Sequence, residues 1–97
     1  MYLIQIDAAD DYEANIYAKG KVAIPKVIER IKQMLIEEAI INLDHVDEYT
    51  TDTPNLQNAY VSDFETILQR GFDFTIWFKN GDKYFVMVEI NRIEVLK

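Results

Sequence analysis

The chain has 97 residues, no cysteine and a formal net charge of −7, which arises from 17 acidic and 10 basic side chains. This length predicts a single domain, residues 1–97, and an apolar content of 49 % with 12 % aromatic residues is enough for a hydrophobic core. The lack of cysteine excludes disulfides, thiolate zinc sites and cysteine nucleophiles. The excess of carboxylates argues against direct binding of nucleic acid, because contacts to phosphates need Lys and Arg.

The sequence offers no sign of membrane insertion or secretion. No apolar run approaches the roughly 20 residues that a membrane-spanning helix needs. The N-terminal segment lacks the basic head of a signal peptide and alternates like a β-strand. A small secreted domain usually carries disulfides, so we expect this protein in the cytoplasm, without membrane contact.

The first half of the chain predicts a hairpin followed by a helix. Alternating apolar residues indicate strands over 2–7 and from 12 to about 19, with the acidic pair at 10–11 forming the turn. Pro25 suits the first position of a helix, and apolar residues at the helical period continue to about residue 41. Basic residues near the start of this helix and acidic residues near its end oppose the helix dipole.

The middle of the chain predicts a short strand and a second helix. The strand is expected near 45–50, and the helix at 54–70, where Gly71 suits the position just after the helix end. An alternative divides this helix, because Ser62 and Glu65 form a capping-box pattern that would restart it at residue 63.

A C-terminal hairpin is the clearest element of the sequence. Its strands are expected over 72–78 and 84–95, joined by a turn at Asn80-Gly81. A two-residue loop would place Ile76 opposite Phe85. A three-residue loop with Gly81 in the left-handed conformation would place Ile76 opposite Tyr84. We expect the second register, because only that register puts both apolar series on one face of the sheet.

That register gives a buried and an outer face to the hairpin. Phe74, Ile76, Val86 and Val88 are then predicted core residues. The outer face receives Trp77, Phe85 and Met87, which are residue types enriched in the cores of interfaces. We expect these three to contact a partner protein or a second copy in a homodimer, unless a helix or the N-terminal hairpin covers them.

Together these elements predict an α+β fold. The expected architecture is an antiparallel sheet of about four strands packed with two helices, in the order β-β-α-(β)-α-β-β. The bracketed strand is the segment near residues 45–50.

Motifs for catalysis are weak or incomplete. His45 lies among acids in Asp44–Glu48, but a single His without fixed ligand spacing is more typical of a solvated acidic segment than of a metal site. Asp73, Glu89 and Asn91 resemble the D…E-x-K layout of restriction-type nucleases, yet Asn91 occupies the place of the catalytic Lys. Ser62, the sole Ser, has no expected contact with His45. We therefore expect no catalytic residue, no metal and no cofactor.

The acidic residues are separated from the basic ones along the chain. Residues 33–69 contain no Lys or Arg, although they hold many of the acids. Solubility explains such a surface, but segregated carboxylates in loops also suit binding to a basic protein. The carboxylates expected to bind such a partner are Asp10, Asp11, Asp44, Asp47, Glu48 and Asp52.

In size, acidity and lack of a catalytic motif, the chain resembles the small inhibitors encoded by phages and mobile elements, of which the anti-CRISPR proteins are the best-known group. This resemblance implies a non-enzymatic inhibitor that presents an acidic surface to a basic, nucleic-acid-handling protein, such as a nuclease or its nucleic-acid channel. The alternatives are an immunity protein that neutralises a toxin and a small metal-dependent enzyme that uses clustered carboxylates.

Overall fold

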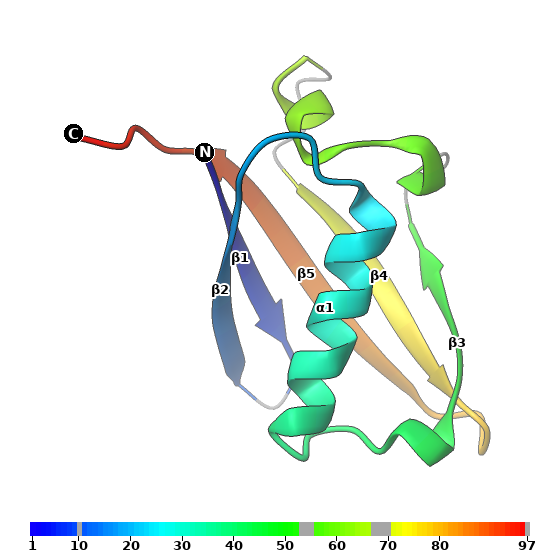
Figure 1. Ribbon diagram of the computed structural model, residues 1–97. Coiled ribbons are helices and arrows are strands. Elements are labelled where there is room, and N and C mark those ends of the chain that lie inside the picture. Colours follow the sequence, from blue (N-terminus) through cyan, green and yellow to red (C-terminus); the bar gives the residue numbers. More distant parts are fainter. Residues whose placement is uncertain (10, 53–55, 67–70, 97) are drawn as a thin grey trace.

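A computed structural model describes residues 1–9, 11–52, 56–66 and 71–96, in which one α-helix lies across one face of a five-stranded antiparallel sheet (Figure 1). The elements are β1 (Tyr2–Ala8), β2 (Tyr12–Ala18), α1 (Ile24–Glu37), β3 (Val46–Thr51), β4 (Gly71–Phe78) and β5 (Lys83–Arg92). The strand order in the sheet is β2-β1-β5-β4-β3. The predicted α+β class and antiparallel sheet are confirmed, and the short strand predicted near 45–50 is β3.

The C-terminal hairpin adopts the register that the core pattern predicted. Ile76 pairs with Tyr84 and Phe74 pairs with Val86. Gly81 has a φ of +91°, and its backbone N–H donates to the carbonyl of Phe78 at 3.0 Å, so the turn has the expected left-handed residue. The last strand ends at Arg92, before the predicted limit at residue 95.

The helix α1 has the expected first turn but ends earlier than the pattern indicated. Pro25 lies in its first turn, and the N–H of Ile24 donates to the carbonyl of Ala59 at 2.9 Å, in place of a side-chain cap. After Glu37 the chain enters the left-handed region at Ala39, whose φ is +57°. This reversal lets Ile41 fold back into the core, so the predicted helix end near residue 41 is wrong. Among the described helices, none is long and apolar enough to cross a membrane.

The predicted second helix at 54–70 is wrong in the described part of that segment. Two short 3₁₀ helices, Leu56–Asn58 and Val61–Glu65, replace it. Between them Tyr60 is extended and bridges to Ala23, and the N–H of Val61 donates to the carbonyl of Val22 at 2.8 Å. These tertiary hydrogen bonds use backbone groups that an α-helix would need. Residues 53–55 and 67–70 lie outside the described part.

The expected capping box and helix-ending glycine also have other roles. The backbone N–H of Tyr60 donates to a side-chain oxygen of Asp63 at 2.7 Å, so Asp63, rather than Glu65, closes the turn. Gly71 is the first residue of β4, where a Cβ atom would lie 2.2 Å from the carbonyl oxygen of Val88. Gly71 therefore permits close approach of β4 to β5.

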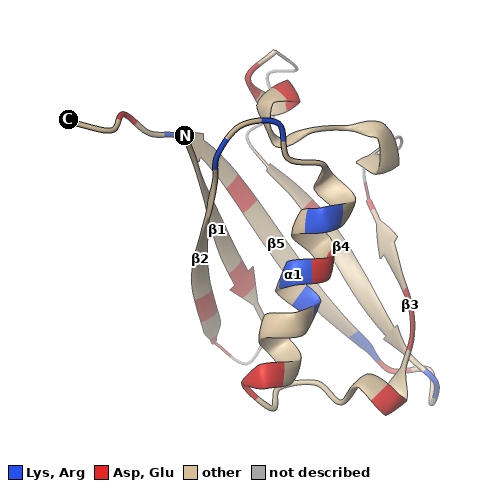
Figure 2. Cartoon of the chain, in the orientation of Figure 1, with Lys and Arg blue, Asp and Glu red and all other residues tan. Residues whose placement is uncertain are grey.

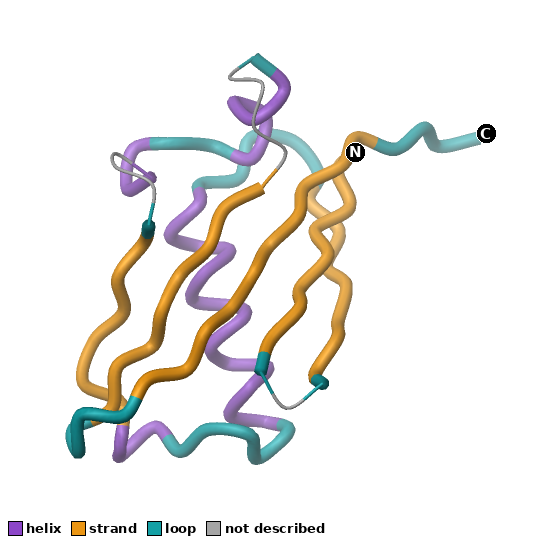
Figure 3. The backbone as a smooth tube through the Cα atoms, turned by 180° about the vertical axis from the view of Figure 1, so that it is seen from behind, coloured by secondary structure: helices purple, strands orange, loops and turns teal. Residues whose placement is uncertain are grey.

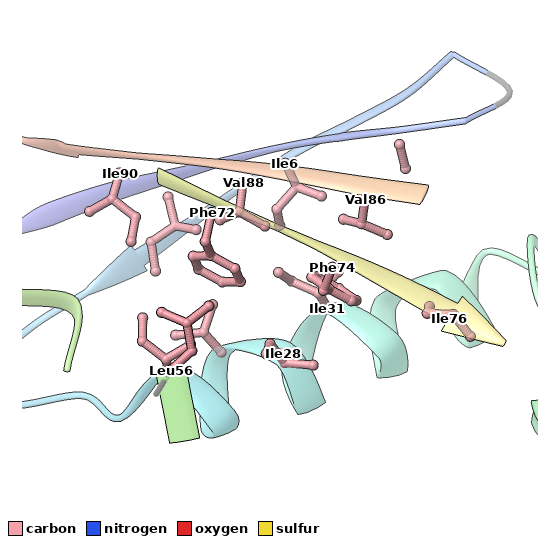
Figure 4. Packing of buried hydrophobic residues seen from close by; sticks show 14 of the residues in the cluster. Ile6, Ile28, Ile31, Leu56, Phe72, Phe74, Ile76, Val86, Val88 and Ile90 are labelled. Carbon is pink, nitrogen blue, oxygen red and sulfur yellow. The ribbon is translucent and has the colours of Figure 1, made fainter. Parts of the chain in front are cut away.

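The core lies between α1 and the inner face of the sheet (Figure 4). All four predicted core residues of the hairpin are buried, and Phe74, Ile76 and Val86 are fully inaccessible. The helix contributes a stripe of buried residues, Ile24, Val27, Ile28, Ile31 and Leu35. Phe72 stacks against Phe74 with ring centroids 6.2 Å apart. This layer of side chains fills one side of the sheet, and none of the described elements covers the other side.

Candidate protein-binding face

The outer face of the sheet, opposite α1, is not covered by any described element (Figure 3). The N-terminal hairpin extends the sheet through the pairing of β1 with β5, so it does not fold over the C-terminal hairpin. Side chains on a strand alternate between faces, so the even-numbered core residues of β5 leave Phe85, Met87 and Glu89 directed outward.

A row of carboxylates crosses this outer face with Met87 near its centre. Met87 pairs with Asp7 on one side and Asp73 on the other. Glu13 pairs with Asp7, and Asp52 follows β3 with its N–H donating to the carbonyl of Asp73 at 3.2 Å. All five residues are exposed. Neighbouring strands lie about 4.8 Å apart, so adjacent residues of this row are separated by about that distance. Four of the five residues are carboxylates.

A second row beside the first adds another carboxylate and several amides. Glu89 pairs with Gln5, and Gln5 pairs with Asn15. The side-chain amide of Asn91 donates to Gln5 Oε1 at 3.2 Å and to Glu89 Oε1 at 3.1 Å. A shallow hollow of about 590 Å³ lies over β2, β1 and β5, lined on this face by Gln5, Asp7, Glu13, Asn15, Met87 and Glu89.

Apolar side chains lie next to these rows. Phe85 and Met87 are 54 % and 55 % exposed, which is high for such large apolar residues. Trp77 is half-buried, and its indole N–H donates to Thr50 Oγ1 at 3.0 Å, which holds the ring in place. The ammonium of Lys83 lies 5.5 Å from the centroid of the Trp77 ring and 5.3 Å from that of Phe85.

The outer face is mainly acidic, whereas the side that carries α1 holds both acidic and basic residues (Figure 2). The carboxylates of the outer face are Asp7, Glu13, Glu48, Asp52, Asp73 and Glu89, and Lys83 is the cation among the outward residues of the described strands. Basic residues gather instead on α1 and in the segment before it. The three ion pairs of the described residues involve Glu29, Glu37 and Glu65, so the outer carboxylates are not neutralised by ion pairs within that part of the chain.

Five of the predicted binding residues come together on the outer face. Trp77, Phe85 and Met87 share it, as the register predicted. Glu48 pairs with Trp77, and Asp52 lies beside Asp73 at the end of the acidic row. The alternative in which a helix or the N-terminal hairpin covers the aromatic residues does not occur in the described structure.

The remaining predicted carboxylates are scattered. Asp11 lies in the turn between β1 and β2 with a φ of +59°, and Asp44 lies in the 3₁₀ helix Leu43–His45. Asp47 is located at the irregularity in the pairing of β3 with β4. Asp10 lies outside the described residues. Asp11, Asp44 and Asp47 are exposed but do not join the acidic rows.

Four carboxylates of the face were not among the predicted binding residues. Asp7, Glu13, Asp73 and Glu89 lie within or at the ends of regular strands, whereas the prediction favoured acidic residues in loops. The signal that identifies them is the alternation of the strands. Each is an acidic residue between two apolar ones, and this pattern occurs in four separate segments of the sequence.

The catalytic interpretations that use His45 gain no supporting geometry in the described residues. Asp44 and His45 are exposed and line a hollow of about 620 Å³ at the C-terminal end of α1, with mainly apolar neighbours. Ser62 belongs to a 3₁₀ helix at the opposite end of the sheet (Figure 1). Within the described ranges, no three His, Cys, Asp or Glu side chains lie close enough to hold a metal ion.

In comparisons with known proteins, no family model, curated protein or solved structure matches this chain. The outer face is therefore the feature that bears on function. Its distinguishing property is an uncovered apolar centre among carboxylates that lack ion-pair partners in the described residues.

Proposed function

We propose that this chain is a non-enzymatic binding protein that docks the outer face of its sheet onto a basic protein surface. The observation that carries the proposal is the row Glu13–Asp7–Met87–Asp73–Asp52, in which exposed carboxylates flank an exposed apolar side chain. Uncompensated carboxylates next to apolar surface suit Lys and Arg side chains, whose apolar stems cover Met87 while their charged ends reach Asp7 or Asp73.

The apolar residues of the outer face contribute to the binding energy through burial of their surface, in addition to the contribution of the charges. Trp77, Phe85 and Met87 bury large areas when a partner excludes water, and aromatic residues with Met are enriched at interface centres. The carboxylates around them accelerate encounter with a positively charged partner and disfavour anionic ones. Nucleic acid is therefore a poor ligand for this face, whereas a protein that binds nucleic acid offers the required positive charge.

We extend the proposal to inhibition of a nucleic-acid-handling protein. Carboxylates spaced along a rigid sheet occupy the same basic groove that phosphates would occupy, so binding of this chain and of nucleic acid would be mutually exclusive. The resemblance to small phage inhibitors, including the anti-CRISPR proteins, implies this partner class. An immunity protein that covers a basic toxin would use the face in the same way, and the identity of the partner distinguishes the two.

The proposal is tested by affinity capture with a charge-matched pair of variants. The first variant, Asp7→Asn with Asp73→Asn, removes the two carboxylates beside Met87. The second, Glu29→Gln with Glu38→Gln, changes the net charge equally, but on α1 and at the residue that caps its C-terminal end. Proteins captured from a bacterial lysate at low salt by the wild-type chain and by the α1 variant, yet lost from the outer-face variant, are the expected partners.

Two further measurements decide the result. Captured partners should be basic, and an added oligonucleotide should release them from the immobilised chain. Should both variants retain the same proteins as the wild type, the outer carboxylates serve solubility alone and the proposal is wrong. Retention that an oligonucleotide does not affect would keep the binding face but reject competition with nucleic acid.

A further inference from the structure

Within the described residues, β2 forms one edge of the sheet, and alternate residues of this strand have backbone groups without a strand partner. The N–H of Ala9 donates to the carbonyl of Phe85, and the N–H of Ile93 donates to the carbonyl of Met1, so the odd-numbered residues of β1 direct their backbone groups toward β5. Alternate residues bond to opposite neighbours, so the even-numbered residues of β1 bond to β2. Even residues of β2 pair with them, which leaves the N–H and C=O groups of Glu13, Asn15 and Tyr17 directed away from the sheet.

The two edges of the sheet differ in how well they are protected against pairing. At the β3 edge, the pairing register shifts between Val46 and Glu48, and acidic residues surround the shift. The β2 strand has seven residues in unbroken register with β1 and contains no Pro, Lys or bulge, which are usual devices that block an edge. Its one charged residue is Glu13. Its inward residues Tyr12, Ala14 and Ile16 are only partly buried, and Tyr17 is 63 % exposed.

We propose that β2 pairs with β2 of a second copy of this chain, antiparallel about a two-fold axis at Asn15, to form a continuous ten-stranded sheet. In this register Asn15 pairs with the partner's Asn15, and Glu13 pairs with the partner's Tyr17. Both pairs use the outward-directed backbone groups. The interface is isologous, as in most homodimers.

The sequence of β2 is complementary to itself in this register. Each large inward residue faces a small one, because Ile16 lies opposite the partner's Ala14 and Tyr12 lies opposite the partner's Ala18. The single charge of the strand, Glu13, meets a neutral Tyr, so no like charges face each other. A shift to the next symmetric register leaves two residues at one end of each strand without a strand partner. The Asn15-centred register is therefore the one that pairs all seven residues.

The dimer would place both outer faces on one side. Paired residues in an antiparallel sheet share a face, so the acidic rows of the two copies continue across the junction. This inference rests on the edge of β2 and not on the proposed function. Dimerisation and binding to a basic partner should also respond oppositely to salt. Screening relieves repulsion between two chains of net charge −7 but weakens attraction to a basic partner.

Cysteine cross-linking tests the pairing and its register together. The chain contains no Cys, so Asn15→Cys introduces a single thiol. Paired Asn15 Cα atoms would lie about 5.5 Å apart, within disulfide range. The control Glu13→Cys places its thiols four residues apart along the strands, about 14 Å, which is beyond that range. Under mild oxidation we expect Asn15→Cys to form covalent dimers at least tenfold faster than Glu13→Cys.

The oligomeric state in sedimentation equilibrium provides the second test. The wild-type mass should approach that of two chains as concentration and salt increase. Asn15→Pro removes an N–H from the free edge, and Asn15→Asp places two carboxylates opposite each other. Both should remain monomeric, with unchanged circular dichroism. A wild-type chain that stays monomeric at its highest soluble concentration, or equal cross-linking of the two cysteine variants, would overturn the proposal.

Discussion

Phe74 and Phe85 allow the two faces of the sheet to be compared with the same substitution. Phe74 is fully buried beneath α1, whereas Phe85 lies on the outer face in the neighbouring strand. Phe74→Ala should reduce the free energy of unfolding by about 3–5 kcal/mol, because it leaves a cavity in the core. Phe85→Ala should cost about 1 kcal/mol or less, since its ring is already half in water.

Urea denaturation followed by circular dichroism measures both changes. A domain of this size has a total stability of about 5–10 kcal/mol, so Phe74→Ala alone approaches the threshold of unfolding. Equal losses for the two variants would mean that the outer face is covered in solution.

Tyr2 offers a test of the contact between the first strand and the 3₁₀ helix Val61–Glu65. Its hydroxyl donates to Glu65 Oε2 at 2.9 Å. This hydrogen bond, with a smaller contribution from desolvation, raises the pKa of Tyr2 above its ordinary value of 10. The fold therefore favours the protonated form, so this contribution to stability is fully present below pH 10 and is lost as the pH rises through the raised pKa.

Glu65→Gln should lower the pKa of Tyr2 toward its ordinary value. The measurement is an alkaline titration of tyrosinate absorbance, with Tyr2→Phe identifying the contribution of this residue. Glu29→Gln is the control, because Glu29 lies on α1 and leaves the hydrogen bond intact. A titration of Glu65→Gln that superimposes on the wild-type curve would show that the contact does not form in solution.

At the scale of elements, the end of α1 has a residue that is unfavourable for its conformation. Ala39 has a φ of +57°, and the N–H of Ile40 donates to the carbonyl of Leu35 at 2.9 Å, as in a helix ending that usually contains Gly. Ala39→Gly should stabilise the protein by about 0.5–1 kcal/mol, because Gly adopts this conformation without steric cost. Thermal unfolding should show a higher midpoint.

The control for this expected gain in stability introduces Gly in the middle of α1. Gln33 is exposed and lies within the regular helix, so Gln33→Gly should destabilise the protein by about 1 kcal/mol. Opposite signs for the two variants would confirm the position of the helix end. A loss of stability in Ala39→Gly would instead indicate that α1 continues toward residue 41, as its apolar pattern predicted.

At the scale of the whole molecule, substitution of Lys83 tests whether the negative charge of the outer face governs binding to a partner. Its ammonium lies over Trp77 and Phe85, so it places one positive charge on the acidic face. Lys83→Gln should strengthen binding to a captured basic partner by about fivefold at low salt, which corresponds to about 1 kcal/mol for one contact in water. The dependence of affinity on salt should become steeper.

Lys26→Gln is the matched control for Lys83→Gln. It makes the same change in net charge, but Lys26 is exposed on α1, on the other side of the molecule. Surface plasmon resonance with the same partner should show little effect for this variant. Equal effects of the two variants would mean that total charge, and not the outer face, governs association.

The sequence by itself determined most strands, the position of α1 and the register of the C-terminal hairpin. These follow from local alternation, from Pro25 and from the requirement that Phe74, Ile76, Val86 and Val88 share one side. Such signals act over a few residues, and burial of one face selects a single register from them. For the same reason Trp77, Phe85 and Met87 were correctly assigned to the opposite face.

Only the tertiary structure decided the conformation of the segment between β3 and β4. It also decided which carboxylates lie together. Tyr60 follows a helical apolar spacing, but its bridge to Ala23 and the hydrogen bond from the N–H of Val61 to the carbonyl of Val22 hold Tyr60 extended. Asp7 and Asp73 are far apart in the chain, and each is an ordinary polar position in its own strand. The strand order places β5 between β1 and β4, and thereby sets both carboxylates beside Met87, because non-local pairing and not local pattern determines which strands are neighbours.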